Sequence, residues 1–176
     1  TTDNFWQNHN LLNLAWRIDS HWTTSATMHY TRGHGYYDEF RYQNKLKKFG
    51  LSDFTLADGS LLKKTDFVRQ KGLTQDTYGM LWNVNYEDSR WDVMAGASFR
   101  NFEGNHWGYL TYVANEELRR EVMADGKYKY YDSDATKADN QIYLKGTYHL
   151  TPAWDVFADV QYRHVGFMTS GINDKF

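Results

Sequence analysis

Two short stretches of this chain combine glycine, histidine and aromatic residues in a way that could bind a ligand. In Gly33-His34-Gly35-Tyr36-Tyr37, the glycines allow a sharp turn while the imidazole and phenol rings face a ligand. In Asn105-His106-Trp107-Gly108-Tyr109, a polar and aromatic cluster on a loop could stack against a sugar or a siderophore ring. Each has a plainer interpretation, namely a strand ending in a bend and a loop packing on its neighbour. The candidate ligand-binding residues are His34, Tyr36, Tyr37, His106, Trp107 and Tyr109.

Other chemistries find little support. The chain has no cysteine, which excludes disulfides and thiolate metal ligands. Its seven histidines are scattered, and no pair has the i, i+4 spacing of a helical metal site. Ser98 and His106 are the only loosely suitable pair for a hydrolase, and no third residue joins them. We expect no metal, no cofactor and no enzymatic activity, and the net charge of −2 argues against nucleic acid as a partner.

The composition is polar on average but rich in aromatic residues. Aromatics make up 18% of the 176 residues, although the mean hydropathy is −0.78. No run of 18 or more apolar residues is present, so the sequence predicts no transmembrane helix. Two kinds of protein combine these properties: carbohydrate-binding β-sandwiches and outer-membrane β-barrels with large polar loops.

Three segments that begin with tryptophan repeat one pattern of alternating apolar and polar residues. Their apolar positions are Trp22, Thr24, Ala26, Met28 and Tyr30, then Trp91, Val93, Ala95, Ala97 and Phe99, then Trp154, Val156, Ala158, Val160 and Tyr162. A period of two indicates a strand with one wet and one apolar face. A helix would leave several of these apolar positions off its stripe. Strands are therefore expected.

A further alternating segment precedes each of these three, separated from it by a short turn. The sequence thus predicts an antiparallel meander of about six strands in three hairpins, near 10–19, 22–32, 76–87, 91–101, 140–150 and 154–165. Long loops are expected near 33–75 and 102–139. Two stretches within them look helical, 66–71 capped by Thr65 and 116–123 capped by Asn115.

The placement of the aromatic residues favours a membrane barrel over a soluble sandwich. Tryptophans follow each turn and another aromatic ends each strand, as in the two aromatic girdles of membrane barrels. The expected membrane-interface residues are Trp22, Tyr30, Trp91, Phe99, Trp154 and Tyr162. Charged residues at polar positions would form networks inside the barrel, namely Arg17, Arg100, Lys145, Asp155, Asp159 and Arg163.

Six strands are too few to close a membrane barrel, and an open sheet leaves two edges of backbone groups without partners. We therefore expect the sheet to be completed by strands that this chain does not contain. If isolated, it should self-associate through its exposed strand edges or depart from the native barrel.

Several stretches resemble TonB-dependent outer-membrane receptors of the Bacteroides type, in an order and spacing that span nearly the whole chain. They are 27–40 (TMHYTRGHGYYDEF), 66–69 (DFVR), 77–79 (TYG), 104–108 (GNHWG) and 157–165 (FADVQYRHV). The resemblance implies the outer membrane of a Gram-negative bacterium and a 22-stranded transmembrane β-barrel with long extracellular loops, closed by a plug domain. It implies import of a scarce extracellular nutrient, such as an iron–siderophore complex, with energy delivered by TonB through the plug.

The chain departs from that family in extent, because it has neither a plug nor a segment that contacts TonB. It is expected to be a fragment of the barrel that does not transport alone. Its expected partners are the remainder of the barrel and plug, outer-membrane lipid and the nutrient. The stretch 113–123 departs from the family pattern, so the identity of the ligand does not follow. A soluble carbohydrate-binding β-sandwich is the alternative.

Overall fold

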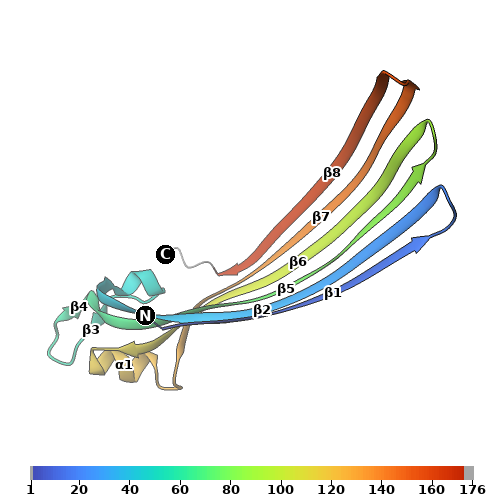
Figure 1. Ribbon diagram of the computed structural model, residues 1–176. Coiled ribbons are helices and arrows are strands. Elements are labelled where there is room, and N and C mark those ends of the chain that lie inside the picture. The colour runs from blue at the N-terminus through green and yellow to red at the C-terminus, as the bar shows by residue number, and fades with distance from the viewer. Residues whose placement is uncertain (1, 173–176) are drawn as a thin grey trace.

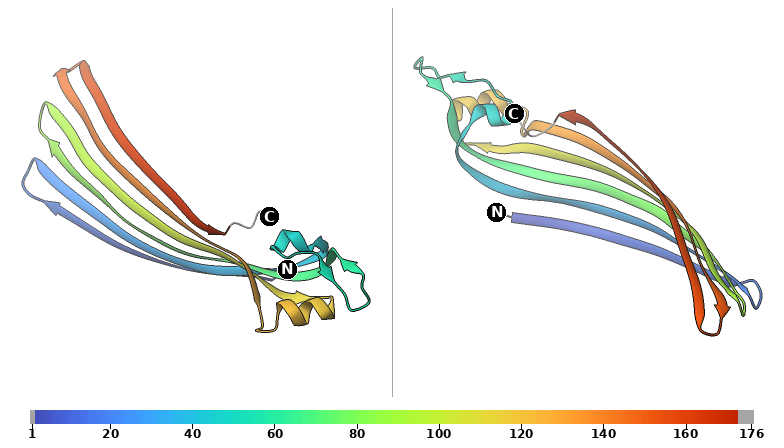
Figure 2. Two further views of the ribbon diagram at one scale, coloured as in Figure 1. Left: turned by 180° about the vertical axis from the view of Figure 1, so that it is seen from behind. Right: turned by 90° about the horizontal axis from the view of Figure 1, so that it is seen from above.

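The computed structural model describes residues 2–172, which are mostly β-structure. Six long antiparallel strands form one sheet in the order β1-β2-β5-β6-β7-β8. This sheet is a single curved layer, bent along its strands (Figures 1 and 2). Its strands are β1 (Thr2–Arg17), β2 (Trp22–Lys45), β5 (Lys64–Glu87), β6 (Trp91–Val113), β7 (Tyr128–Thr151) and β8 (Trp154–Ile172). The predicted all-β class and the antiparallel sheet of six strands are confirmed.

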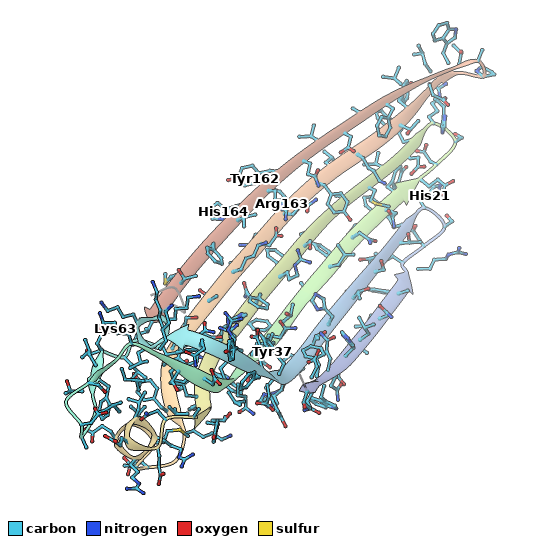
Figure 3. The ribbon with its side chains drawn as sticks, turned by 90° about the vertical axis from the view of Figure 1, so that its left-hand side faces the viewer. His21, Tyr37, Lys63, Tyr162, Arg163 and His164 are labelled. Atoms are coloured by element: carbon cyan, nitrogen blue, oxygen red, sulfur yellow. The ribbon has the colours of Figure 1, made fainter. Side chains whose placement is uncertain are left out.

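Cross-strand pairing brings the alternating residues of all six strands into line, because paired residues share one face of the sheet. One row from β1 to β8 is Leu14, Ala26, Trp82, Ala97, Ile142 and Tyr162. The adjacent row is Asn13, Thr27, Leu81, Ser98, Gln141 and Arg163. We call the face that carries the first row the apolar face and the other the polar face. Figure 3 shows the neighbours Tyr162 and Arg163 on opposite sides of β8.

Three short turns join the strands at one end of the sheet, and a side-chain oxygen closes each. The Asp19 and Asp88 carboxylates both accept hydrogen bonds from the backbone N–H groups two and three residues further on, at 2.7 and 2.8 Å. In the third turn the Thr151 hydroxyl accepts a hydrogen bond from the backbone N–H of Ala153 at 3.3 Å. Asp88 also accepts from the Tyr86 hydroxyl, and these bonds lower its pKa to about 2.

The strands extend much further from the turns than the sequence predicts. Only residues 46–63 of the loop expected near 33–75 lie between β2 and β5, and only 114–127 of the one expected near 102–139 lie between β6 and β7. β1 likewise begins at Thr2 and not near residue 10. The expectation failed because strict alternation stops beyond Tyr30, where both faces carry polar and aromatic side chains. The backbone hydrogen-bond ladder needs no alternation and continues.

The segments that connect the strands at the far end carry the remaining elements: η1 (Leu46–Phe49), β3 (Phe54–Thr55), β4 (Leu61–Leu62) and α1 (Glu116–Val122). The helix expected after Asn115 is confirmed as α1, and the Asn115 side chain accepts from the Leu118 N–H at 2.9 Å. The helix expected at 66–71 is wrong, because these residues belong to β5 and pair with β2. Tertiary pairing outweighs the local capping signal there. No helix within residues 2–172 is long and apolar enough to cross a membrane.

The buried apolar side chains gather at the end of the sheet remote from the turns. Phe49 of η1 packs on the polar face against Phe67, with ring centroids 4.6 Å apart. The other members of this distal core are Leu46, Leu110, Val113, Leu118, Tyr130 and Tyr131. η1 lies on the inner side of the bend and α1 on the outer side (Figure 1). Between this core and the turns, residues 2–172 place no second layer on the sheet.

Candidate functional site

Near the turns, the apolar face forms a hydrophobic band open to its surroundings. The side chains of Trp154, Val160 and Tyr162 on β8 are 71%, 69% and 64% exposed. On the inner strands, Trp82 and Phe99 are still exposed although both neighbouring strands flank them. Soluble monomers rarely expose contiguous apolar patches larger than a few hundred Å². Apolar patches of this kind mark surfaces that contact a membrane or another protein.

Two aromatic rows border this band: a lower border nearer the turns, formed by Trp22, Trp91 and Trp154, and an upper border further from them. From β2 to β8, strand pairing shifts both borders toward the turns by the same number of residues. Trp22 pairs with Tyr86, which pairs with Val93, so Trp91 lies two residues nearer the turns than the row of Trp22. Trp91 pairs with Tyr148 and this with Val156, so Trp154 lies two residues lower again.

The upper border, formed by Tyr30, Phe99 and Tyr162, descends in parallel with the lower one. Tyr30 pairs with Tyr78 and this with Asn101, which is two residues above Phe99. Phe99 in turn pairs with Asn140 and this with His164, which is two residues above Tyr162. Both borders therefore shift by two residues for every two strands.

This shift defines how the strands incline to the band. One residue per strand is a rise of about 3.3 Å over a strand spacing of about 4.8 Å, which gives a tilt of about 35°. Trp22 and Tyr30 lie eight residues apart on β2. At about 3.4 Å per residue and this tilt, the band is about 22 Å high. Membrane barrels have strands tilted by about 35–45° and an apolar band about 25 Å tall.

The polar face behind the band carries hydrogen-bonded and charged side chains. Arg163 donates to both oxygens of the Asp139 carboxylate at 2.9 and 2.5 Å, and Arg100 donates to the same group at 3.1 Å. A charge network with Arg100 and Arg163 was expected, but the carboxylate that joins them is Asp139, which was not among the residues predicted for it. Lys145 and Asp159 pair directly across β7 and β8.

Beyond the band, the polar face carries a cavity of about 210 Å³ that draws side chains from five strands. They include Phe5 of β1, Tyr37 of β2, Lys71 of β5, His106 of β6 and Tyr131 of β7. The Lys71 ammonium lies 5.3 Å from the centroid of the Tyr131 ring. A cation, an imidazole and several rings on one surface can hold a ring-bearing ligand through stacking and charge.

Two of the rings at this cavity lie across glycines of the neighbouring strand. A Cβ on Gly35 would come within 2.5 Å of the Phe5 ring, and one on Gly108 within 2.2 Å of the Tyr131 ring. Any larger residue at either position would displace the ring above it. Glycine therefore keeps this part of the polar face hollow.

The structure divides the six candidate ligand residues between the two faces. Tyr37 and His106 lie on the polar face and both line the cavity, to which Tyr36 also contributes atoms at the rim. His34, Tyr36, Trp107 and Tyr109 occupy positions on the apolar face. Each motif therefore contributes residues to both faces, because adjacent residues of a strand point to opposite faces. Figure 3 shows Tyr37 far along the strands from His21 of the first turn.

A cluster of ion pairs lies between this cavity and the distal core. Arg69 donates to one oxygen of Glu39 at 2.9 and 2.6 Å, and Arg41 donates to the other oxygen at 2.8 Å. Partial burial by itself would raise the pKa of Glu39, but the hydrogen bonds from the two guanidinium groups outweigh this and lower it. The carboxylate is therefore charged at neutral pH and ties β2 to β5.

Sequence reasoning missed Phe5, Lys71 and Tyr131 at the cavity. Lys71 fell in a stretch expected to be helical, while Phe5 and Tyr131 lay outside the expected strands. The signal that could have found them is glycine in a strand, which marks a close approach of another group. Gly35 and Gly108 both stood within the two motifs, and their pairing partners were unknown from the sequence.

Within residues 2–172, no group of three or more histidine or acidic side chains could hold a metal ion. No family model matches the chain, and a comparison with curated proteins finds no match.

Proposed function

We propose that this chain is part of the barrel of a TonB-dependent outer-membrane receptor, which binds a scarce nutrient outside the cell and imports it. The observation that carries the proposal is the parallel descent of the two aromatic borders on an exposed apolar face. The two borders lie eight residues apart on each of three strands, and the tilt and height that they imply are close to those of a membrane barrel. The resemblance to the receptor family supports the same conclusion.

In this proposal the apolar face contacts lipid and the polar face lines the interior of a closed barrel. The interior needs polar side chains because it holds water, which suits the Arg100–Asp139–Arg163 network. The cavity between Tyr37 and His106 would then open inward on the extracellular side, where a nutrient arrives. The short turns would lie on the periplasmic side.

The remaining strands of the barrel are the partners that the edges require. Among residues 2–172, β1 pairs only with β2 and β8 only with β7. Backbone groups cannot be left without partners in lipid, so further strands would pair with both edges. Closure by a plug and energy from TonB belong to the same proposal.

The proposal is tested by the size and location of the protein that carries this sequence in cells. An antibody against residues 51–62 is applied to outer-membrane fractions, separated on a gel with and without heating. We expect a band several times larger than 20.8 kDa that shifts on heating, as folded barrels do. A band of 20.8 kDa in the soluble fraction would overturn the proposal and favour a carbohydrate-binding protein.

A further inference from the structure

Four aromatic residues continue the apolar face beyond the membrane-facing band. Trp6, Tyr36, Trp107 and Tyr109 lie on the same face as Trp22 and Phe99, but further from the turns. Trp107 and Tyr109 touch edge to face, with centroids 5.4 Å apart. We call Tyr36, Trp107 and Tyr109, together with Asn105, Asp132 and Asp134, the Trp107 cluster.

The indole of Trp107 lies flat on the sheet. A Cβ on Gly72 of the neighbouring strand would come within 2.2 to 2.6 Å of three atoms of that indole. Gly72 also pairs with Tyr36 on its other side, so Tyr36 and Trp107 flank the same glycine on the same face. An indole whose one side rests on the backbone turns its other side outward. The arrangement offers a stacking platform.

Polar groups surround this platform. The Asn105 side-chain amide donates to Asp132 at 2.7 Å and to Asp134 at 2.8 Å, so the two carboxylates are held in place. Asp132 also pairs with Lys129, whose ammonium lies 5.6 Å from the centroid of the Tyr109 ring. Flat rings that stack on C–H faces, beside fixed carboxylate oxygens that accept from hydroxyl groups, suit a sugar.

The surroundings of the cluster discriminate between possible ligands. Asp76 and Glu103 pair directly across β5 and β6 on the same face, and Arg32 lies 3.9 Å from Asp76. Together with Asp132 and Asp134 these two carboxylates outnumber the neighbouring cations Arg32 and Lys129, so this part of the wall is acidic on balance. Acidic side chains disfavour an anionic group such as a phosphate and favour neutral hydroxyl groups. The nutrient cavity, in contrast, lies on the opposite face with Lys71 and His106.

The height of the cluster identifies what it meets. Trp107 lies eight residues beyond Phe99 on β6, which is about 27 Å further along the bent strand from the upper border of the band. That distance exceeds the depth of a phospholipid headgroup and lies among the sugars that a glycolipid extends from its anchor. The face is continuous with the one that contacts lipid, so a membrane lipid reaches it without leaving the bilayer.

We propose that the Trp107 cluster binds the saccharide headgroup of the glycolipid that surrounds the protein in the outer leaflet. The inference rests on the proposed function, because it needs the apolar face to contact the outer membrane. It assigns Tyr36, Trp107 and Tyr109 to the outer wall of the receptor and leaves Tyr37 and His106 to the nutrient. One pair of sequence motifs thereby serves two partners.

The test uses the intact protein, purified from outer membranes in mild detergent and freed of bound lipid. It is titrated with lipooligosaccharide purified from the same cells, and separately with that lipid after removal of its saccharide by mild acid. The variants are Trp107→Ala and Tyr109→Ala, and the control is Phe102→Ala. Phe102 lies on β6 on the opposite face, so the control removes a ring from the same strand.

We expect Trp107→Ala and Tyr109→Ala each to weaken binding of lipooligosaccharide about three- to tenfold, the effect of losing one aromatic stacking partner. Phe102→Ala should leave this binding unchanged, and Trp107→Phe should restore most of it. The lipid without saccharide should bind weakly and equally to all variants. The gel shift on heating verifies that each variant is folded. If Trp107→Ala does not fold, Tyr109→Ala alone tests the binding of lipooligosaccharide.

Equal binding of lipooligosaccharide by wild type and both variants would overturn the inference while leaving the proposed function intact. Equal binding of the two lipids by the wild type would do the same, because the saccharide would then contribute nothing. Absence of the protein from the outer membrane would overturn the proposed function, and this inference with it. A loss of nutrient binding in Trp107→Ala with no change in lipid binding would assign the cluster to the imported ligand and also overturn it.

Discussion

The half of the sheet near the turns and the half remote from them share one hydrogen-bond ladder but differ in how their side chains are used. Near the turns, apolar and polar faces alternate strictly and no buried core exists among the described residues. In the remote half, both faces carry polar and aromatic groups, and a small core under η1 and α1 holds the connecting segments. The first half depends on its surroundings for stability, whereas the second carries part of its stability within itself.

This difference explains what the sequence could and could not predict. Strict alternation at Trp22–Tyr30 and its two counterparts revealed the strands, the turns and the apolar face, because a strand with one apolar and one polar face repeats its side-chain types with a period of two. Beyond Tyr30 both faces carry polar and aromatic side chains, so the period is lost while the ladder continues. The lengths of β2 and β5 followed from pairing between residues distant in the sequence.

The candidate site shows the same division. Motifs rich in glycine and aromatic residues drew attention to Tyr37 and His106, which do line a cavity. Side chains alternate between the two faces along a strand, so the face of each residue follows from its distance along the chain from a residue whose face is known. This distance is informative only if the strand has no bulge, and none lies between Trp22 and Tyr37. Sequence alone therefore located the two motifs but not the separation of their residues into two surfaces.

The largest expected effect is on the remote half. Phe67→Ala removes a fully buried ring that packs on Phe49, and should cost about 3–5 kcal/mol of local stability. The measurement is hydrogen exchange of the amides in η1 and the distal end of β5 in the intact protein. Phe157→Ala is the matched control, since that ring is 63% exposed on the polar face near the turns. An equal loss of protection near Trp22 would show that the halves are not independent.

The half near the turns is challenged by a charge on its apolar face. Val160→Arg should destabilise the membrane-inserted protein by about 2 kcal/mol, because an arginine on the lipid face of a barrel costs about 2–4 kcal/mol at mid-depth and less near the interface. Gln161→Arg places the same charge one residue away on the polar face and should be nearly neutral. The temperature of the gel shift on heating measures both. If the two variants behave alike, the apolar face does not contact lipid.

A smaller effect is expected from filling the hollow beneath a ring. Gly108→Ala places a methyl group within 2.2 Å of the Tyr131 ring, and displacing that ring toward the open cavity should cost about 1 kcal/mol, the low end of the range for overpacking. Gly166→Ala is its control, because a Cβ there meets nothing within 4 Å. Hydrogen exchange of β6 and β7 beside Gly108 reports the difference. Equal protection in both variants would show that the ring moves aside freely.

The smallest effect concerns acid sensitivity of the remote half. The pKa of Glu39 is lowered in the folded protein, so its ion pairs with Arg69 and Arg41 stabilise fully above the ordinary glutamate pKa of about 4.3. This contribution is lost as the pH falls through the lowered folded pKa. Hydrogen exchange of β2 and β5 beside Glu39, followed from pH 6 downward, should show it in the wild type and not in Glu39→Gln. Identical profiles would remove Glu39 as the cause.

The side-chain oxygens that close the three turns have a consequence for how such a protein could gain or lose strands in evolution. Each turn, at Asp19, Asp88 and Thr151, is followed three residues later by the tryptophan of the lower border. Each hairpin thus contains a turn, one residue of the lower border and one of the upper border. Its borders are shifted by two residues relative to those of the next hairpin. In a closed barrel of such hairpins, a unit can be gained or lost by duplication or deletion of a gene segment while the height of the membrane band stays the same. The circumference of the barrel is then free to vary in steps of two strands.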